Sequence, residues 1–285
     1  MKILNPIFFL ILFIVAWGLQ SCDKVKEPYA EIKPAGGDTN YRMILLEDYT
    51  GHKCVNCPAA GILARDLEEL YKGQIMVMAV HATWFATPDQ TGDFTANYTT
   101  EAGNTWSSEF QIESAPYGLI NRRYYSGSHI YLNPKYWGNA VQDFVELPKV
   151  AIMSINNVYN DATRSLSTKI ETKFLEQTQG TINLTVCILE DSIVSPQKNN
   201  DPLVGPVPVI YQYVYMDMLR GNVSGIWGDE LTTSVIPNTV YSKSYTFQMN
   251  EAWVAPHCWI LAFISDANTH EILQTVRKKV DPDNY

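Results

Sequence analysis

Cys54 and Cys57 are separated by two residues and follow a short apolar run, and this spacing indicates thiol chemistry. A cysteine pair at the start of a helix can form a disulfide within one turn, and the positive end of the helix dipole stabilises a thiolate there. His52 and Lys53 directly precede the first cysteine and are expected to lower its pKa further. We therefore expect Cys54 to be the exposed attacking thiol and Cys57 to be the buried resolving thiol.

Two alternatives to exchange chemistry remain open for this pair. Zinc binds cysteines with this spacing, but it needs a second pair of ligands, and no similar Cys or His pair occurs elsewhere in the sequence. The other alternative is a structural disulfide in a redox-inactive domain. We expect neither a bound metal nor a cofactor.

The residues around the pair predict the elements that position it. An apolar run at 43–49 predicts a buried strand before the turn, and apolar side chains at helical spacing predict a helix over 59–71 that Gly73 ends. A second apolar run at 75–81 predicts another buried strand. These segments form a βαβ unit with parallel strands, and His81 would lie at the same sheet edge as the cysteine turn. There it could tune the pair or contact substrate, or be a hydrogen-bonded core residue.

The rest of the chain falls into two patterns. Residues 82–114 indicate loops around one or two short helices, Pro116 begins a further strand, and a helix is expected over 134–147 before Pro148. After Pro148 the pattern alternates and predicts seven strands, which is typical of an antiparallel immunoglobulin-like sandwich. The predicted strands cover 150–158, 165–174, 181–189, 207–218, 239–248, 258–265 and 272–280. The proline-rich segment 190–206 is expected to be a mobile or binding loop.

Several residues of the second half have two interpretations each. Cys187 and Cys258 fall on predicted strands, where they could form a bridge or stay as buried free thiols. Trp227, Trp253 and Trp259 could line a ligand surface, although aromatic side chains in a sandwich usually belong to the core.

The composition of the chain excludes one class of partner. The 285-residue chain has 21 Lys and Arg against 30 Asp and Glu, a formal charge of -9 that argues against nucleic-acid binding.

The N-terminus has the pattern of an export signal. Residues 3–17 are almost wholly apolar after Lys2, which is typical of a secretory signal. Ser21-Cys22 follows and resembles the lipobox of bacterial lipoproteins, which predicts lipid attachment at Cys22. We expect a signal peptide at 1–21, a flexible tether at 22–40 and two domains at 41–148 and 149–285.

The first half resembles the thioredoxin-like superfamily. Asp48 matches the buried carboxylate that takes the proton of the resolving cysteine, with Glu47 as the alternative if the register differs by one. Pro116 matches the family's cis-proline, and the resemblance implies that the backbone at Ala115 pairs with a substrate peptide; an ordinary turn proline is the alternative. The chain departs from the family where Lys53 replaces the usual tryptophan and where proline occurs after the pair, at Pro58.

A closer resemblance covers most of the chain after residue 40. The motifs are similar to those of the Omp28-related outer-membrane lipoproteins of Gram-negative bacteria, and they lie at 49–58, 80–81, 116, 120–122, 189–193, 219–221 and 225–228. This resemblance implies a thioredoxin-like α/β domain followed by an all-β sandwich, in a protein of the cell envelope.

Two functions of different classes follow. The first is an outer-membrane lipoprotein that exchanges disulfides with cysteine-containing envelope proteins, using Cys54, Cys57, Asp48 and Pro116, with His52, Lys53, His81 and Ala115 around them. The second is a non-catalytic surface or adhesion lipoprotein in which the sandwich binds a partner and the cysteine pair is structural. Both are attached to the membrane through lipid and neither binds nucleic acid.

Overall fold

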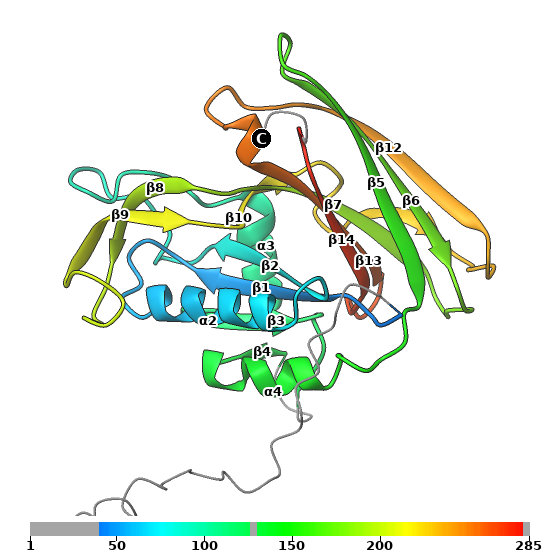
Figure 1. Ribbon diagram of the computed structural model, residues 1–285, viewed down its shortest axis with the longest axis horizontal. Helices are drawn as coiled ribbons and strands as arrows, with labels where there is room; N and C mark the ends of the chain where they lie inside the picture. Colours follow the sequence, from blue (N-terminus) through cyan, green and yellow to red (C-terminus); the bar gives the residue numbers. More distant parts are fainter. Residues whose placement is uncertain (1–39, 126–129, 282–285) are drawn as a thin grey trace, which may run out of the picture. The chain divides into compact units, whose positions relative to one another are not determined.

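The computed structural model describes residues 40–125 and 130–281, which are mostly β-structure in several sheets with few helices (Figure 1). All of these residues belong to one compact unit. The signal peptide predicted at 1–21, the lipid site at Cys22 and tether residues 23–39 lie outside the described residues. In the described part of the chain no helix is both long and apolar enough to cross a membrane.

The predicted βαβ unit is confirmed. Strand β1 (Ile44–Thr50) precedes helix α2 (Cys57–Leu70), and strand β2 (Ile75–His81) returns parallel to β1. The register pairs each residue of β1 with one of β2 along their full length. Gly73 connects helix and strand with a φ of 81°, a conformation that glycine adopts without steric strain.

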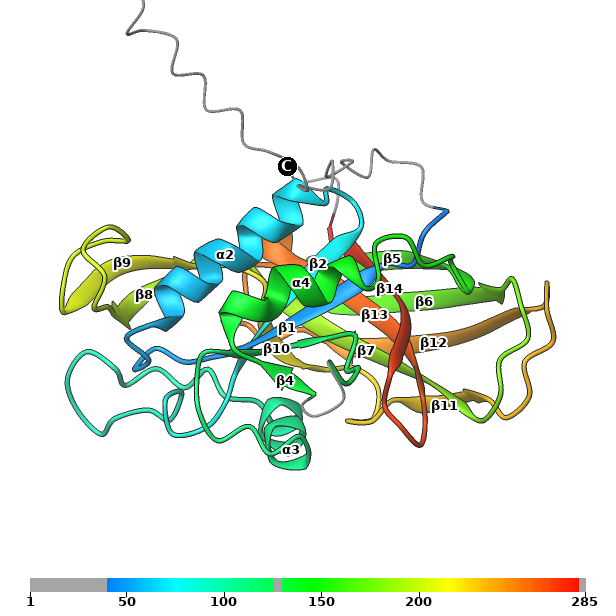
Figure 2. The same ribbon diagram turned by 90° about the horizontal axis from the view of Figure 1, so that it is seen from below.

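The remaining elements of the first half complete a four-strand segment with helices on both faces. Strand β3 (Tyr117–Ile120) runs antiparallel to β1, and the short β4 (Tyr131–Leu132) pairs with β3. Helix α4 (Trp137–Gln142) packs with α2 against one face, whereas α3 (Glu101–Glu109) packs against the other (Figure 2). The short helix expected in 82–114 and the helix expected in 134–147 are both present, although α4 is shorter than predicted.

The second half forms a β-sandwich. One layer is the antiparallel sheet β12-β6-β5, and the other contains β14, β13 and β7, with β11 paired to β7. The core between these layers includes Leu166, Ile170, Ile188 and Ile260, which are fully buried. The strand bounds are β5 (Ala151–Asn160), β6 (Ser165–Phe174), β7 (Ile182–Glu190), β11 (Asp229–Thr232), β12 (Val240–Gln248), β13 (Cys258–Asp266) and β14 (Ile272–Lys279).

A short strand joins the two halves into one sheet. Strand β10 (Met218–Asn222) pairs antiparallel with β7 and parallel with β2, where Met218 lies opposite Ala79. The resulting sheet has the order β14-β13-β7-β10-β2-β1-β3-β4. The domain boundary near Pro148 stays a prediction, but strands from both sides of it share hydrogen bonds and a hydrophobic core.

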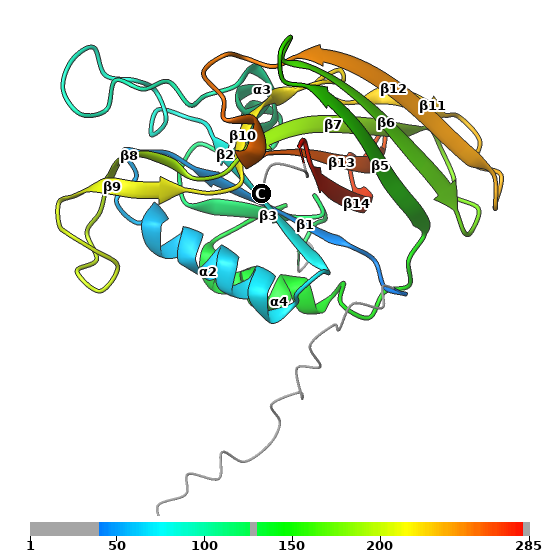
Figure 3. The same cartoon turned by 45° about the horizontal axis from the view of Figure 1, so that its top comes forward.

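The segment expected to be a long loop forms a hairpin instead. Strands β8 (Ile193–Lys198) and β9 (Val209–Tyr215) pair antiparallel as a separate two-stranded sheet. This hairpin leaves the main body next to β10 and extends toward the N-terminal end of α2 (Figure 3). The single strand predicted at 207–218 is therefore divided between β9 and the start of β10.

Cys187 and Cys258 are free buried thiols, so the alternative of a bridge between them is wrong. Their strands pair, but Cys187 belongs to the core shared by the two halves and Cys258 to the sandwich core. Alternation along β7 and β13 therefore sends the two side chains to opposite faces of the sheet. Burial raises the pKa of Cys187 and raises that of Cys258 to about 12, so both stay protonated at neutral pH.

The shared core encloses an ion pair. Arg122 donates from Nε and Nη2 to the two carboxylate oxygens of Glu47 at 2.8 and 2.7 Å, and both side chains are almost completely buried. The guanidinium also lies 4.6 Å from the centre of the Trp106 ring and 5.7 Å from that of Trp227, a residue of the second half. Trp227 thus packs in the core around Arg122 rather than on an open ligand surface.

Removing one partner of this pair is expected to destabilise the whole fold. Glu47→Gln leaves the guanidinium of Arg122 buried without its counter-charge, which costs about 3–5 kcal/mol of unfolding free energy. Urea unfolding at pH 7 measures this loss, and the double variant Glu47→Gln/Arg122→Met should recover part of it. A loss below about 1 kcal/mol, the size typical of an exposed pair, would contradict the assignment.

Candidate functional site

The cysteine turn joins β1 to α2 and contains the disulfide between Cys54 and Cys57. Cys57 is the first residue of α2 and Pro58 follows, a position where the absent N–H of proline costs no helical hydrogen bond. Gly51 fits because an added Cβ would lie 2.5 Å from the carbonyl of Phe85. The backbone N–H of Lys53 donates to that same carbonyl at 3.0 Å, which fixes the start of the turn.

Asp48 lies beneath the disulfide. It points to the α2 side of β1, where it and Cys57 line the same cavity. Burial raises the pKa of Asp48 to about 7, and Arg65 on α2 opposes this shift. Its Oδ1 has no hydrogen-bond partner within the described residues. Glu47, the alternative candidate, points to the opposite face and pairs with Arg122.

The two histidines near the pair are uncharged at neutral pH. Burial lowers the pKa of His52, and the neighbouring Lys53 lowers it further. Burial, with His52 and Arg220 nearby, lowers the pKa of His81 to about 3. The expectation that His52 supplies positive charge to Cys54 is therefore wrong, because its ring is buried against Phe94 at 5.6 Å between centroids.

Lys53 remains the cation next to the first cysteine, but it has a partner. Its ammonium group donates to Asp89 at 2.9 Å and to Thr87 at 3.2 Å. This pairing holds the charge at the surface of the turn and reduces the field that it exerts at Cys54.

Ala115 and Pro116 lead into β3 through a cis peptide bond. The register pairs Tyr117 with Tyr49 near the end of β1, so Pro116 lies at the end of the sheet from which the cysteine turn extends. Both residues are partly exposed.

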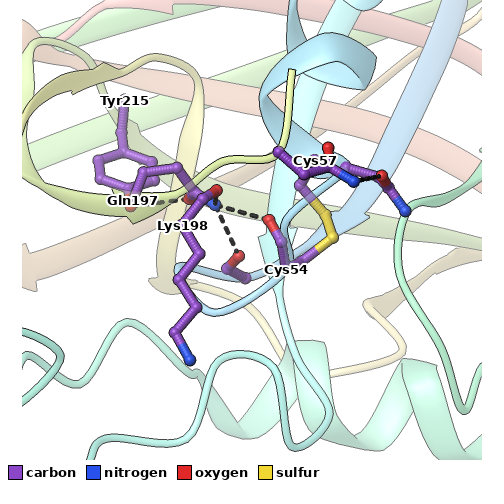
Figure 4. Close-up of a disulfide and its surroundings, with 8 residues drawn as sticks. Cys54, Cys57, Gln197, Lys198 and Tyr215 are labelled. Atoms are coloured by element: carbon purple, nitrogen blue, oxygen red, sulfur yellow. Dashed lines mark hydrogen bonds between the residues drawn. A yellow bond between two sulfur atoms is a disulfide. The ribbon is translucent and has the colours of Figure 1, made fainter. Parts of the chain in front are cut away.

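The β8–β9 hairpin covers the disulfide (Figure 4). Gln197 donates from Nε2 to the Cys54 carbonyl at 2.8 Å, and Lys198 donates its backbone N–H to the His52 carbonyl at 2.9 Å. Asn200 adds a backbone bond to Val55 at 3.2 Å. Cys54 is only 1% exposed and Cys57 3%, so the expectation of an exposed attacking thiol is wrong for this structure. The hairpin and the loop at Phe85 both bond to the backbone of the cysteine turn.

The tyrosines of the hairpin hold Gln197 in place. Tyr215 donates its hydroxyl to Gln197 Oε1 at 2.9 Å and contacts His81 ring-to-ring at 5.3 Å. Tyr213 contacts Tyr215 at 4.7 Å between centroids, and its hydroxyl approaches Gly61 on α2. Sequence patterns do not identify these residues, because Gln197 bonds to the cysteine turn across 143 positions of the chain.

The arrangement can support thiol–disulfide exchange. A helix N-terminus stabilises the thiolate, and a buried carboxyl with a pKa near neutrality can accept or return the proton of Cys57. Across the described part of the chain, no group of three or more His, Cys, Asp or Glu side chains is placed to hold a metal ion. The other sequence candidates, Trp253 and Trp259, pack against Phe247 and near Lys279, away from the disulfide.

Comparison with solved structures indicates the fold. The chain is similar to HBP35 of Porphyromonas gingivalis with a TM-score of 0.61 and 15% identity, over 85% of this chain and 76% of that one. It also matches a domain of the outer membrane lipoprotein Omp28 from the same organism at 22% identity, over 46% of this chain and 96% of that domain, with a TM-score of 0.32. No curated protein matches the sequence.

A match to a family model assigns the chain to a protein family. The model described as outer membrane protein Omp28 matches residues 103–284, which is more than half of the chain and includes strands of both halves. The chain therefore belongs to the Omp28 outer-membrane protein family and is a protein of the cell envelope.

Proposed function

We propose that this protein is an outer-membrane lipoprotein, attached through lipid at Cys22, whose thioredoxin-like first half exchanges disulfides with cysteine-containing envelope proteins. Cys54 is the attacking thiol, Cys57 resolves the mixed disulfide, Asp48 exchanges the proton and Pro116 with Ala115 positions the peptide. His52, Lys53 and His81 surround the pair without binding a metal or cofactor.

The arrangement of the first half supports the thioredoxin-like assignment. The strand order β2-β1-β3-β4 places the parallel βαβ unit and the antiparallel pair in one sheet segment, with α2 and α4 on one face and α3 on the other. The cysteine pair at the head of α2 and Pro116 directly before β3 also support this assignment. The sandwich half, which we propose is immunoglobulin-like, supplies the hairpin.

The observation that carries the proposal is that Cys57 and Asp48 line the same cavity. A structural disulfide needs no acid group beneath it, and an unpaired buried carboxyl costs stability. Asp48 nevertheless lies there, with its Oδ1 unpartnered among the described residues and its pKa raised to about 7. A role in proton exchange during the reaction explains why a carboxyl occupies this position.

The burial of the disulfide favours a second function. The hairpin closes the site and presents apolar side chains outward, namely Val194, Leu203, Val207, Tyr211 and Val214. Leu203 at the tip is 95% exposed. In this alternative the protein is a non-catalytic surface or adhesion lipoprotein, the hairpin's outer face contacts a partner, and the disulfide is structural.

An insulin-reduction assay separates the two functions. Wild-type protein with dithiothreitol should accelerate insulin reduction, whereas Cys54→Ser should abolish the acceleration because the attacking sulfur is lost. Cys258→Ser is the matched control, since it removes a buried thiol outside the pair and should retain activity. A potential for the pair well below about -300 mV, with no turnover, would establish the structural alternative.

The acid role of Asp48 predicts a pH profile. The rate at which dithiothreitol reduces the pair, divided by the thiolate concentration, should fall as the pH rises through about 7, because protonated Asp48 returns the proton to Cys57. Asp48→Asn should lower this normalised rate at pH 6 by about tenfold or more and remove the inflection. An unchanged profile in the variant would show that Asp48 takes no part.

The hairpin predicts that exchange is gated. Gln197→Ala removes the bond to the Cys54 carbonyl, worth about 0.5–1.5 kcal/mol, so the pair should be reduced about two- to tenfold faster. Gln248→Ala is a matched control, because Gln248 makes the same kind of bond to the Thr163 carbonyl far from the site. Equal rates in wild type and Gln197→Ala would mean that the hairpin is no barrier.

A further inference from the structure

A small cavity lined by Cys57 of the disulfide holds a second carboxyl group. The cavity has a volume of about 30 Å³, enough for one or two water molecules, and lies between α2 and the sheet. Asp48 and Cys57 line it from the first half of the chain. Asp217, which precedes β10, lines it from the second half.

Asp217 is held in place from two sides. Arg277 on β14 donates to its Oδ1 at 2.9 Å, and Asp191 accepts its backbone N–H at 2.8 Å. Asp217 has a φ of 52°, a conformation in which Asp and Asn are the most tolerated non-glycine residues. The position of the carboxyl is therefore set by both backbone and side-chain contacts.

Burial and the charged groups around Asp217 give it a pKa similar to that of Asp48. The pKa of Asp217 is raised to about 7, with burial as the largest cause; Glu68 on α2 and Asp191 also raise it, whereas Arg277 and Arg65 lower it. Arg277 also bonds Glu68 at 2.7 Å, and the side chain of Glu68 is 21% exposed. Asp217 is thus connected through Arg277 to a carboxyl at the surface.

The surroundings of Asp48 include fewer charges. Arg65 on α2 acts on it, Tyr213 on β9 interacts with it, and neutral His81 on β2 lines the same cavity. Arg65 lowers the pKa of both Asp48 and Asp217, so the two carboxyls share one cation as well as one cavity.

We propose that Asp217 is a positioning residue of the exchange site whose charge, across the cavity that both carboxyls line, controls how strongly Asp48 holds its proton. This inference rests on the proposed function. When Asp217 is ionised, its negative charge across the shared cavity disfavours ionisation of Asp48, and this keeps Asp48 protonated and able to give its proton to Cys57.

The step that depends on this proton is the reduction of the disulfide. A thiolate of dithiothreitol attacks Cys54 Sγ, the S–S bond breaks, and Cys57 leaves with the electron pair and takes the proton of Asp48. The second thiolate of the same dithiothreitol molecule then attacks the dithiothreitol sulfur that is bonded to Cys54. This closes the ring and releases the Cys54 thiolate, which takes a proton from water. Dithiothreitol is oxidised to its cyclic disulfide, and the protein pair gains two electrons and two protons.

Asp217→Asn tests the inference, since asparagine preserves shape and backbone conformation. The midpoint of the normalised reduction profile should move to lower pH by about half a unit to one unit, because the like charge across the cavity is then removed. The carboxyl ¹³C shift of Asp48 in the oxidised protein should titrate with the same displacement. This second measurement requires no exchange activity.

Glu190→Gln is the matched control. Glu190 is buried, pairs with Arg220 at 3.2 Å and does not line the cavity, so its replacement should leave both midpoints unchanged. If Asp217→Asn also leaves both unchanged, the inference is overturned while the proposed function stands. If the wild-type pair resists reduction at every pH, the proposed function fails, and the ¹³C titration alone decides whether Asp217 controls Asp48.

Discussion

Ala79 donates its backbone N–H to the carbonyl of Asp217 at 2.8 Å, and this bond holds β10 beside β2. Only two residues separate β9 from β10, so anchoring β10 also fixes the base of the hairpin next to the cysteine turn. The same anchor places the Asp217 side chain at the cavity under the disulfide. One strand junction therefore determines the continuous sheet, the cover over Cys54 and the second carboxyl near Cys57.

That arrangement changes the electrostatic basis of the cysteine pair. His52 and His81 are neutral because burial lowers their pKa values, and Lys53 is engaged by Asp89. The remaining stabilisation of a Cys54 thiolate comes from the N-terminus of α2, which acts at short range and without titrating. Proton transfer at Cys57 then depends on the carboxyls below it, so the second half of the chain contributes to the chemistry of the first.

Local periodicity predicted much of this structure. The βαβ unit, the sandwich strands and the position of the cysteine turn follow from apolar spacing, whereas contacts such as that of Gln197 with Cys54 require a register between distant strands. The prolines in 190–206 favour a loop there, whereas the structure forms β8 within that segment. Pro196 is tolerated in β8 because it lies where the register with β9 shifts between Ser195 and Gln197, so no ladder bond is lost.

The neighbouring residues Glu47 and Asp48 show why the fold is needed to identify the acid group of the site. Strand alternation sends them to opposite faces of β1, and the sequence cannot say which face meets α2. Glu47 receives two bonds from Arg122 in the shared core, so its charge is committed to structure. Asp48 has no such cation in contact, and burial brings its pKa to about 7. Of the two, only Asp48 both faces the cavity that Cys57 lines and has a pKa suited to exchanging a proton with a thiol.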